Sequence, residues 1–261
     1  MTNDADYGFD GSFHTVSARG QVAFVTATSA ALLAAAARSL SRGSTAKAAL
    51  AGGAGAAIIA STTSYVRTTR RGKFEIWARI LDGLDLRGDE TVLDLGCGRG
   101  AVLLAAAQRL PQGRAVGVDL WRADQTGNSL EQTLANATAE RVADRVDIQT
   151  ADITALPLPD DSVDVILSSL VIHNIPGRDG RSRAIAEAAR VLRPGGRLAI
   201  ADLAATADHV RQLRDLGWRT AQRRNLGWRM WWGGPWVPTH LVTATKPPSH
   251  QPPDAGTSGI G

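Results

Sequence analysis

The sequence predicts an α/β fold, with a doubly wound and mostly parallel sheet that follows an N-terminal helical hairpin. Three observations support this prediction. Short β-rich runs alternate with helical patterns from residue 73 onward, a glycine-rich turn follows the first of these runs, and two long uncharged stretches precede residue 68. Steady alternation of strand and helix is typical of parallel sheets whose two faces are covered by helices.

The alternating region carries apolar runs, each followed by a segment with helical periodicity. The expected strands are residues 91–95, 115–118, 146–149, 163–168 and 197–200. The expected helices are residues 74–84, 101–110 and 128–140, a helix whose apolar face runs from 184 to 192, and residues 203–216. Asn128 followed by Glu131 resembles a capping box, and Pro194-Gly195-Gly196 should break the chain before the last parallel strand.

Four parts are expected along the chain. They are a polar N-terminal tail (1–18), a helical hairpin (19–67), an α/β domain (73–247) and a C-terminal tail (248–261). The last part is rich in Pro, Ser and Gly, and we expect it to be disordered. Residues 217–245 should hold short strands together with five of the seven tryptophans.

The hairpin is predicted from two stretches without charged residues, 18 and 19 residues long (20–37 and 48–66). At ~1.5 Å rise per residue each helix would span roughly 27–28 Å, close to the thickness of a bilayer core. Glycines at 52, 53 and 55 would allow close helix packing. We therefore predict a transmembrane hairpin whose cationic flanks place both ends, and the α/β domain, in the cytoplasm.

Two other interpretations of these stretches remain open. One is a soluble, alanine-rich helical pair that packs on the domain or on a partner chain. The other is a secretory signal, although the acidic start of the chain is unlike the cationic start of such signals.

Composition and charge narrow the classes of function. A hydrophobic content of 44% and a charged content of 21% exclude wholesale disorder. The single cysteine, Cys97, excludes an intramolecular disulfide and a cysteine-cluster metal site, and no two histidines have metal-ligand spacing. We therefore predict no metal. The net charge of +4 and a scattered arginine run at 211–229 do not favour nucleic acid as a partner.

The turn Asp94-Leu95-Gly96-Cys97-Gly98-Arg99-Gly100 carries the first chemical signal. Alternate glycines let the backbone turn sharply and approach a ligand, and the following helix start can receive a carboxylate. Dinucleotide binders space their glycines as G-x-G-x-x-G, whereas this turn reads G-x-G-x-G with an acid two residues earlier. That acid would repel a pyrophosphate but can hold an ammonium group. The spacing therefore disfavours a nicotinamide oxidoreductase.

Residues 73–247 resemble the class I S-adenosylmethionine (SAM)-dependent methyltransferases. The resemblance rests on the glycine turn, on Val116-Gly117-Val118-Asp119-Leu120, on Thr150-Ala151-Asp152-Ile153, and on the stretches at 157–164 and 191–198. It implies the Rossmann-like fold of that family and SAM as the cofactor. Asp119 would bind the ribose hydroxyls, Asp152 the adenine amino group, and Ile153 would lie beside the ring. The cofactor-binding residues expected from the resemblance are Asp94, Gly96, Cys97, Gly98, Gly100, Asp119, Leu120, Asp152, Ile153 and Ser168.

The acceptor is expected near the run that follows the fourth strand, Ser168 to Pro176. This run lacks the Asn/Asp-Pro-Pro-Tyr/Phe motif of amino- and base-methylating members. It resembles small-molecule methyltransferases, including those that act on quinones, sterols and other lipids. His173 is the candidate general base, because its ordinary pKa lies near neutrality. A histidine that only hydrogen-bonds its own loop is the competing interpretation, and Asn174 could hydrogen-bond the acceptor.

The sequence thus predicts a membrane-associated methyltransferase that methylates oxygen or carbon of a small, lipophilic acceptor. The late tryptophans at 228, 231, 232 and 236 would cover an apolar acceptor pocket, lie at the bilayer interface or simply pack on the sheet. An RNA or protein methyltransferase and a non-catalytic SAM-binding protein remain alternatives. The oligomeric state is not predicted.

Overall fold

The computed structural model describes residues 5–11, 18–122 and 127–248. Much of the two expected tails therefore lies outside the described residues, including residues 249–261, for which disorder was expected.

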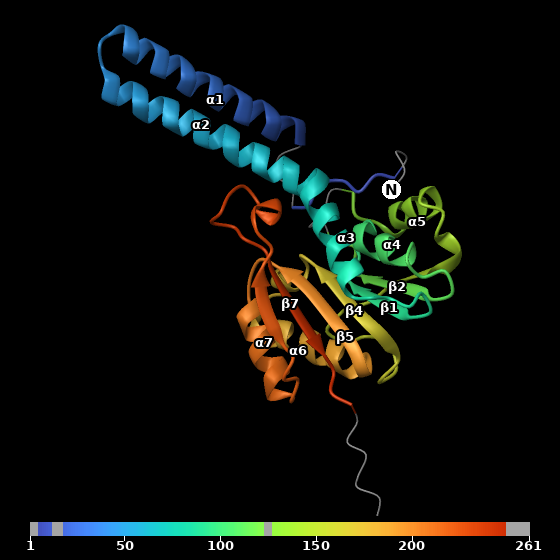
Figure 1. Ribbon diagram of the computed structural model, residues 1–261. Helices are drawn as coiled ribbons and strands as arrows, with labels where there is room; N and C mark the ends of the chain where they lie inside the picture. Colours follow the sequence, from blue (N-terminus) through green and yellow to red (C-terminus); the bar gives the residue numbers. More distant parts are fainter. Residues whose placement is uncertain (1–4, 12–17, 123–126, 249–261) are drawn as a thin grey trace, which may run out of the picture.

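The centre of the molecule is a seven-stranded sheet in the order β3-β2-β1-β4-β5-β7-β6 (Figure 1). Its strands are β1 (Thr91–Leu95), β2 (Arg114–Asp119), β3 (Val146–Thr150), β4 (Val163–Ser169), β5 (Leu192–Asp202), β6 (Gln222–Asn225) and β7 (His240–Thr245). The strands from β1 to β5 pair in parallel, while β7 runs antiparallel to both β5 and β6. The predicted doubly wound, mostly parallel fold is confirmed.

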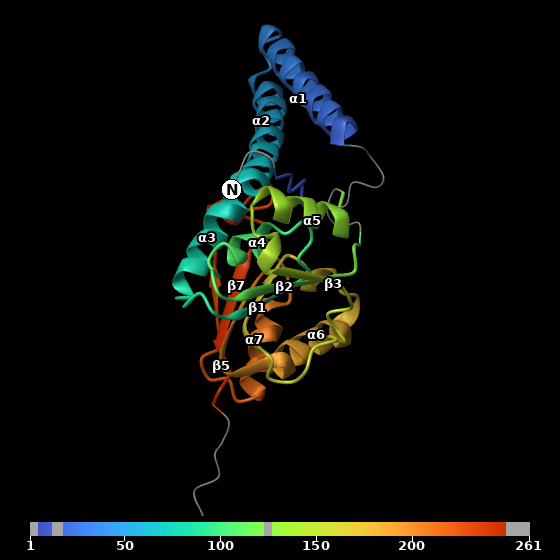
Figure 2. The ribbon, with the colours of Figure 1, turned by 90° about the vertical axis from the view of Figure 1, so that its right-hand side faces the viewer.

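Helices cover both faces of this sheet (Figures 1 and 2). One face carries α3 (Lys73–Gly83), α4 (Ala101–Ala107) and α5 (Leu130–Ala139), and the other carries α6 (Gly177–Val191) and α7 (Thr206–Asp215). Neighbouring strand residues serve opposite faces, so that Val92 packs with α3 and α4 whereas Leu93 packs with α6. Burial on both faces explains why the strands read as continuous apolar runs.

Two local expectations are corrected. The side chain of Ser129, rather than that of Asn128, caps α5 by accepting a hydrogen bond from the Gln132 amide at 3.2 Å. Pro194-Gly195-Gly196 does not end the strand. It lies inside β5, where the register against β4 shifts between Val163 and Val165, so β5 carries extra residues at this point.

The N-terminal hairpin consists of α1 (Ala18–Ser41) and α2 (Thr45–Arg67), which pack against each other and project from the domain (Figures 1 and 2). Small residues make the contact close, as expected. A Cβ on Gly52 would lie 3.6 Å from the Cβ of Ala36, and one on Gly55 would lie 3.4 Å from that of Leu32. Gly53 faces open space, so the role expected for it in packing is not seen.

The hairpin and the domain share a continuous helical segment. A π-helical turn, η1 (Thr68–Gly72), joins α2 directly to α3, where the sequence predicted two separate elements. The segments Gly20–Ser41 and Thr45–Gly83 are long and apolar enough to cross a membrane, by length and composition. Only 6% of the most apolar window of each is buried, so these windows are not core helices of the domain.

Candidate active site

The glycine turn follows β1 at the carboxyl edge of the sheet, where the strand order reverses between β1 and β4. Gly96 and Gly98 have φ angles of 68° and 51°, a region that side chains disfavour. The Gly96 amide donates to the Val118 carbonyl at 2.7 Å, and the Gly98 amide donates to Oδ2 of Asp119 at 2.8 Å. A Cβ on Gly96 would also overlap the side chain of Val171. The turn is therefore fixed to the end of β2 and has no room for side chains at Gly96.

Asp94 lies near the end of β1 and is 1% exposed. Its Oδ1 has no hydrogen-bond partner among the described residues. Burial, and then the neighbouring Asp119, raise the pKa of Asp94 well above its usual range. A buried carboxyl oxygen without a donor costs free energy unless a ligand supplies one. The site therefore fits a ligand that carries an ammonium group.

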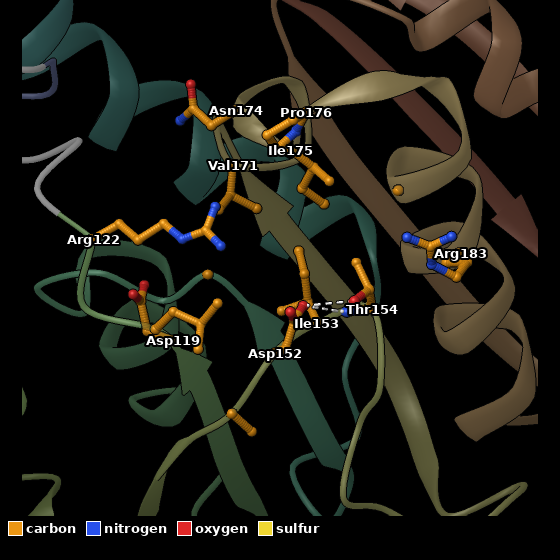
Figure 3. A pocket seen from close by; sticks show the side chains of 14 residues that line it. Asp119, Arg122, Asp152, Ile153, Thr154, Val171, Asn174, Ile175, Pro176 and Arg183 are labelled. Carbon is orange, nitrogen blue, oxygen red and sulfur yellow. Dashed lines mark hydrogen bonds between the residues drawn. The ribbon is translucent and has the colours of Figure 1, made fainter.

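A cavity of about 220 Å³, here called the first cavity, opens beside the turn (Figure 3). Among the residues expected to bind the cofactor, it is lined by Gly96, Asp119, Leu120, Asp152 and Ile153. Figure 3 shows Asp119, Asp152 and Ile153 on one side of the cavity, with Val171, Asn174 and Ile175 on the other. The Asp152 carboxylate accepts hydrogen bonds from the amide and hydroxyl of Thr154, both at 2.8 Å, and these bonds hold its pKa below its usual range.

A second cavity, of about 320 Å³, lies next to the first. The two cavities share four lining residues: Gly96, Asp119, Val171 and Asn174. It also includes Gly98 and His173, so the predicted base lies beside the glycine turn. A ligand that fills the first cavity and the turn would thus present its end to the second cavity.

His173 is held by a carboxylate that the sequence analysis did not identify. Nδ1 of His173 lies 2.5 Å from Oδ1 of Asp202, and the His173 backbone amide donates to Oδ2 at 3.0 Å. Asp202 ends β5 and is fully buried, whereas the His173 side chain is 22% exposed. The carboxylate favours the tautomer with the proton on Nδ1, which leaves Nε2 to accept a proton. The sequence did offer one signal for this contact, because Asp202 is an acid at the end of β5, the strand that pairs with β4.

Residues from outside the α/β repeat close the second cavity. Tyr65 from α2, Trp232 and Asp10 all line it. The Tyr65 hydroxyl donates to the Asp10 carbonyl at 2.5 Å, and Lys73 forms an ion pair with the Asp10 carboxylate at 2.7 Å. The rings of Tyr65 and Trp232 meet edge-on, with centroids 6.0 Å apart.

Four of the residues expected to bind the cofactor line neither cavity: Asp94, Cys97, Gly100 and Ser168. These residues lie in or next to the glycine turn. Gly100 precedes α4 with φ 87°, and the buried Cys97 thiol packs where a Cβ on Gly117 would lie. Ser168 is fully buried and donates to the Leu95 carbonyl at 3.2 Å.

Residues 93–200 match the family model described as a methyltransferase domain. A curated relative, the arsenite methyltransferase of Halobacterium salinarum, is 39% identical over 119 residues, which is 45% of this chain and 28% of the relative. The 27-O-demethylrifamycin SV methyltransferase of Amycolatopsis mediterranei is 35% identical over 146 residues, 52% of this chain and 50% of the relative. The mouse U6 snRNA (guanine-N(2))-methyltransferase THUMPD2 is 32% identical over 159 residues, which is 60% of this chain and 28% of the relative.

The chain thus spans half or less of the length of each of these relatives. Among solved structures, a SAM dependent methyltransferase from Aquifex aeolicus shares the fold, with a TM-score of 0.50 and 20% identity over 64% of this chain and 87% of that one. The segment that matches the family model runs from β1 into β5 and contains the glycine turn, Asp119, Asp152 and His173. Residues 93–200 of this chain therefore form a methyltransferase domain, and the site around the glycine turn fits S-adenosylmethionine as its cofactor.

Proposed function

We propose that this protein transfers a methyl group to an oxygen or an acidic carbon of a small, lipophilic acceptor. The observation that carries the proposal is the His173–Asp202 pair at the wall of the second cavity, beside the glycine turn. A histidine that served only its own loop would need no contact with a cavity. Here the buried carboxylate fixes the ring, and the ring borders the space where an acceptor would meet the cofactor.

The cofactor-binding residues divide between the turn and the first cavity. The Asp94 carboxylate would pair with the ammonium group of the cofactor, because its Oδ1 has no other partner among the described residues. Asp119 would accept the ribose hydroxyls, and Asp152 the adenine amino group beside Ile153, since all three line the first cavity. Gly96 and Gly98 would let the backbone approach the ligand.

SAM supplies a methyl carbon already activated by its sulfonium, so the protein must mainly align the acceptor and remove a proton. Nε2 of His173 would take the proton of the acceptor hydroxyl, or of an acidic C–H, as the new bond to the methyl carbon forms and the C–S bond breaks. The imidazolium that results would be stabilised by Asp202, which faces it through Nδ1. Such base assistance is typically worth ~10²–10⁴-fold in rate.

The lining of the second cavity favours an apolar acceptor. Half of its ten non-glycine lining residues are apolar or aromatic: Leu170, Val171, Leu203, Tyr65 and Trp232. The other five are polar: Asp10, Asp119, Ser169, His173 and Asn174. Ligand sites of this kind orient a mostly apolar molecule with a few polar contacts. The relative that acts on 27-O-demethylrifamycin SV, by its name, supports a small-molecule acceptor.

We further propose that α1 and α2 form a membrane hairpin. Large apolar side chains project from it, among them Val22, Phe24, Leu40 and Leu50, all at least 60% exposed. Such a surface is unusual for a helix pair that stays in water. Cations gather where α2 meets the domain, at Arg67, Arg70 and Arg71 in and after α2, a pattern that favours the cytoplasmic side for the domain.

RNA is the second candidate acceptor, because THUMPD2 is named for methylating an snRNA. The arginines at 211–229 argue against it. Several are engaged within the protein: Arg211 pairs with Asp208, Arg214 donates to the Ala221 carbonyl, Arg223 to Thr206, and Arg229 pairs with Glu75. Phosphate-binding arginines need free donors.

Methyl-labelled SAM tests the proposal. The full-length protein in detergent would be incubated with a bacterial lipid extract and, separately, with the RNA and protein fractions of a lysate. We expect label in lipids or small molecules. Label confined to RNA or protein would contradict the lipophilic acceptor, and label in none of the fractions would favour a SAM-binding protein without transferase activity.

A further inference from the structure

A third cavity, here called the lateral groove, lies outside the active site. It has a volume of about 570 Å³ and runs between one face of α2 and the tryptophan-rich loop that precedes β7. Ala60, Ser64 and Arg67 line it from α2, and Trp228, Trp231 and Trp236 line it from the loop. Figure 1 shows this loop, in orange-red, against the domain end of α2.

The lateral groove and the second cavity are lined by residues that are adjacent in the sequence. Ser64 and Trp231 line the groove, whereas their immediate neighbours Tyr65 and Trp232 line the second cavity. The Ser64 and Thr68 hydroxyls both donate to the Trp231 carbonyl, at 3.1 and 2.8 Å, and so fasten the loop to the helix. The rings of Tyr65 and Trp232 meet edge-on next to this fastening.

The position of the groove along α2 suggests what enters it. The groove begins at Ala60, inside the apolar helix, and ends at Arg67, where the helix meets the domain. The Arg67 guanidinium lies 4.0 Å from the centre of the Trp228 ring, and Arg229 lies 4.4 Å from the same ring. Trp228 and Trp236 remain 49% and 69% exposed. Tryptophan beside arginine at the end of an apolar helix is typical of a membrane interface.

We infer that the lateral groove binds the hydrocarbon tail of the acceptor. The reactive head lies in the second cavity beside His173, and the tail passes between Tyr65 and Trp232 into the groove and toward the bilayer. This inference rests on the proposed function and specifies its substrate class: a membrane lipid with a methylatable head and a single flexible apolar chain. Each methylene buried in the groove should tighten binding about fourfold.

Filling the groove tests the inference. Ala60→Trp places a large side chain in the groove, since Ala60 is exposed and lines it. Thr63→Trp does the same one helical turn along. Ile59→Trp is the matched control, because Ile59 is the neighbouring exposed residue, 45% accessible, and does not line the groove. Calorimetric titration with SAM, in every variant, reports whether the domain is intact.

The readout is label transferred from methyl-labelled SAM to a bacterial lipid extract, with the full-length variants in liposomes made from that extract. We expect both groove variants to transfer label at least tenfold more slowly than Ile59→Trp, with SAM affinity unchanged. Groove variants as fast as the control would overturn the tail site while leaving the methyltransferase proposal intact. A wild-type protein that labels only water-soluble molecules or RNA contradicts the lipid acceptor and removes the tail site with it.

Discussion

The first and second cavities lie side by side but are assembled from different kinds of residues. The first takes Asp119 from the last position of β2 and Asp152 from the loop after β3, so each belongs to the repeating strand–helix unit. The second combines His173 with Tyr65 and Trp232, which come from the hairpin and from the late loop. The first cavity is therefore built by the repeat, whereas the second cavity also needs the segments added at the two ends of the repeat.

This contrast predicts that damage to the glycine turn has the largest effect. Gly96→Ala would force a Cβ into Val171 at a φ of 68°. We expect a loss of roughly 2–4 kcal/mol in the free energy of unfolding, from backbone strain and overpacking together, and at least a 100-fold loss of SAM affinity. Urea denaturation and calorimetry measure the two quantities.

Gly195→Ala is the control for this change. Its φ of 79° carries the same backbone strain, but its Cβ would meet nothing within 4 Å. It should lose only about 1–2 kcal/mol and keep its SAM affinity. Equal losses in the two variants would mean that the contact with Val171 is unimportant.

A change in the first cavity should be smaller and confined to the cofactor. Asp119→Asn keeps the size of the side chain but removes its charge. We expect the dissociation constant for SAM to rise about 10- to 100-fold, as when a hydrogen bond to a charged group is lost. Asp144→Asn, at an exposed acid in η2 (Ala143–Arg145), should leave the constant unchanged. SAM binding that ignores Asp119 would contradict the assignment of the first cavity.

The smallest effect concerns His209 in α7, which is 2% exposed and whose Nε2 has no partner among the described residues. Burial lowers the pKa of His209 below its ordinary value. The unfolded chain therefore takes up this proton first, and stability should fall as pH drops below about 6.5, until folded His209 titrates.

The slope from this group should be at most about 1.4 kcal/mol per pH unit. Urea denaturation between pH 7.5 and 5.5 measures the free energy of unfolding as a function of pH. His209→Asn should reduce the slope of that dependence by the contribution of His209. An identical pH dependence in wild type and variant would show that His209 does not contribute.

The same contrast explains how far the sequence could predict the site. The strands, the glycine turn, Asp119 and Asp152 follow from local patterns, because each of these acids lies at or just after the end of its own strand. Asp202 and Tyr65 were missed because pairing of β5 with β4 places Asp202 against His173, and because the path of α2 brings Tyr65 to the second cavity. Ser168 was expected at the cofactor, but alternation along β4 turns it inward, and it is the next residue, Ser169, that lines the second cavity.

The hairpin shows a similar limit. Its two helices were predicted from hydropathy alone, whereas the π-helical turn that joins α2 to α3 has no periodic signal in the sequence. Because that turn joins α2 to α3 without a break, the end of α2 lies against the domain and Tyr65 lines the second cavity. The lining of the second cavity therefore depends on a junction that local patterns do not encode.

The most direct test of the account is a double-mutant cycle on the methyl-transfer rate at saturating SAM, with His173→Gln, Asp202→Asn and the two combined. The account predicts that His173→Gln slows transfer by about 10²–10⁴-fold with SAM affinity within twofold of wild type. The double variant should be no slower than His173→Gln alone, because the two residues act as one unit. A His173→Gln variant that binds SAM and transfers methyl at the wild-type rate would contradict the account.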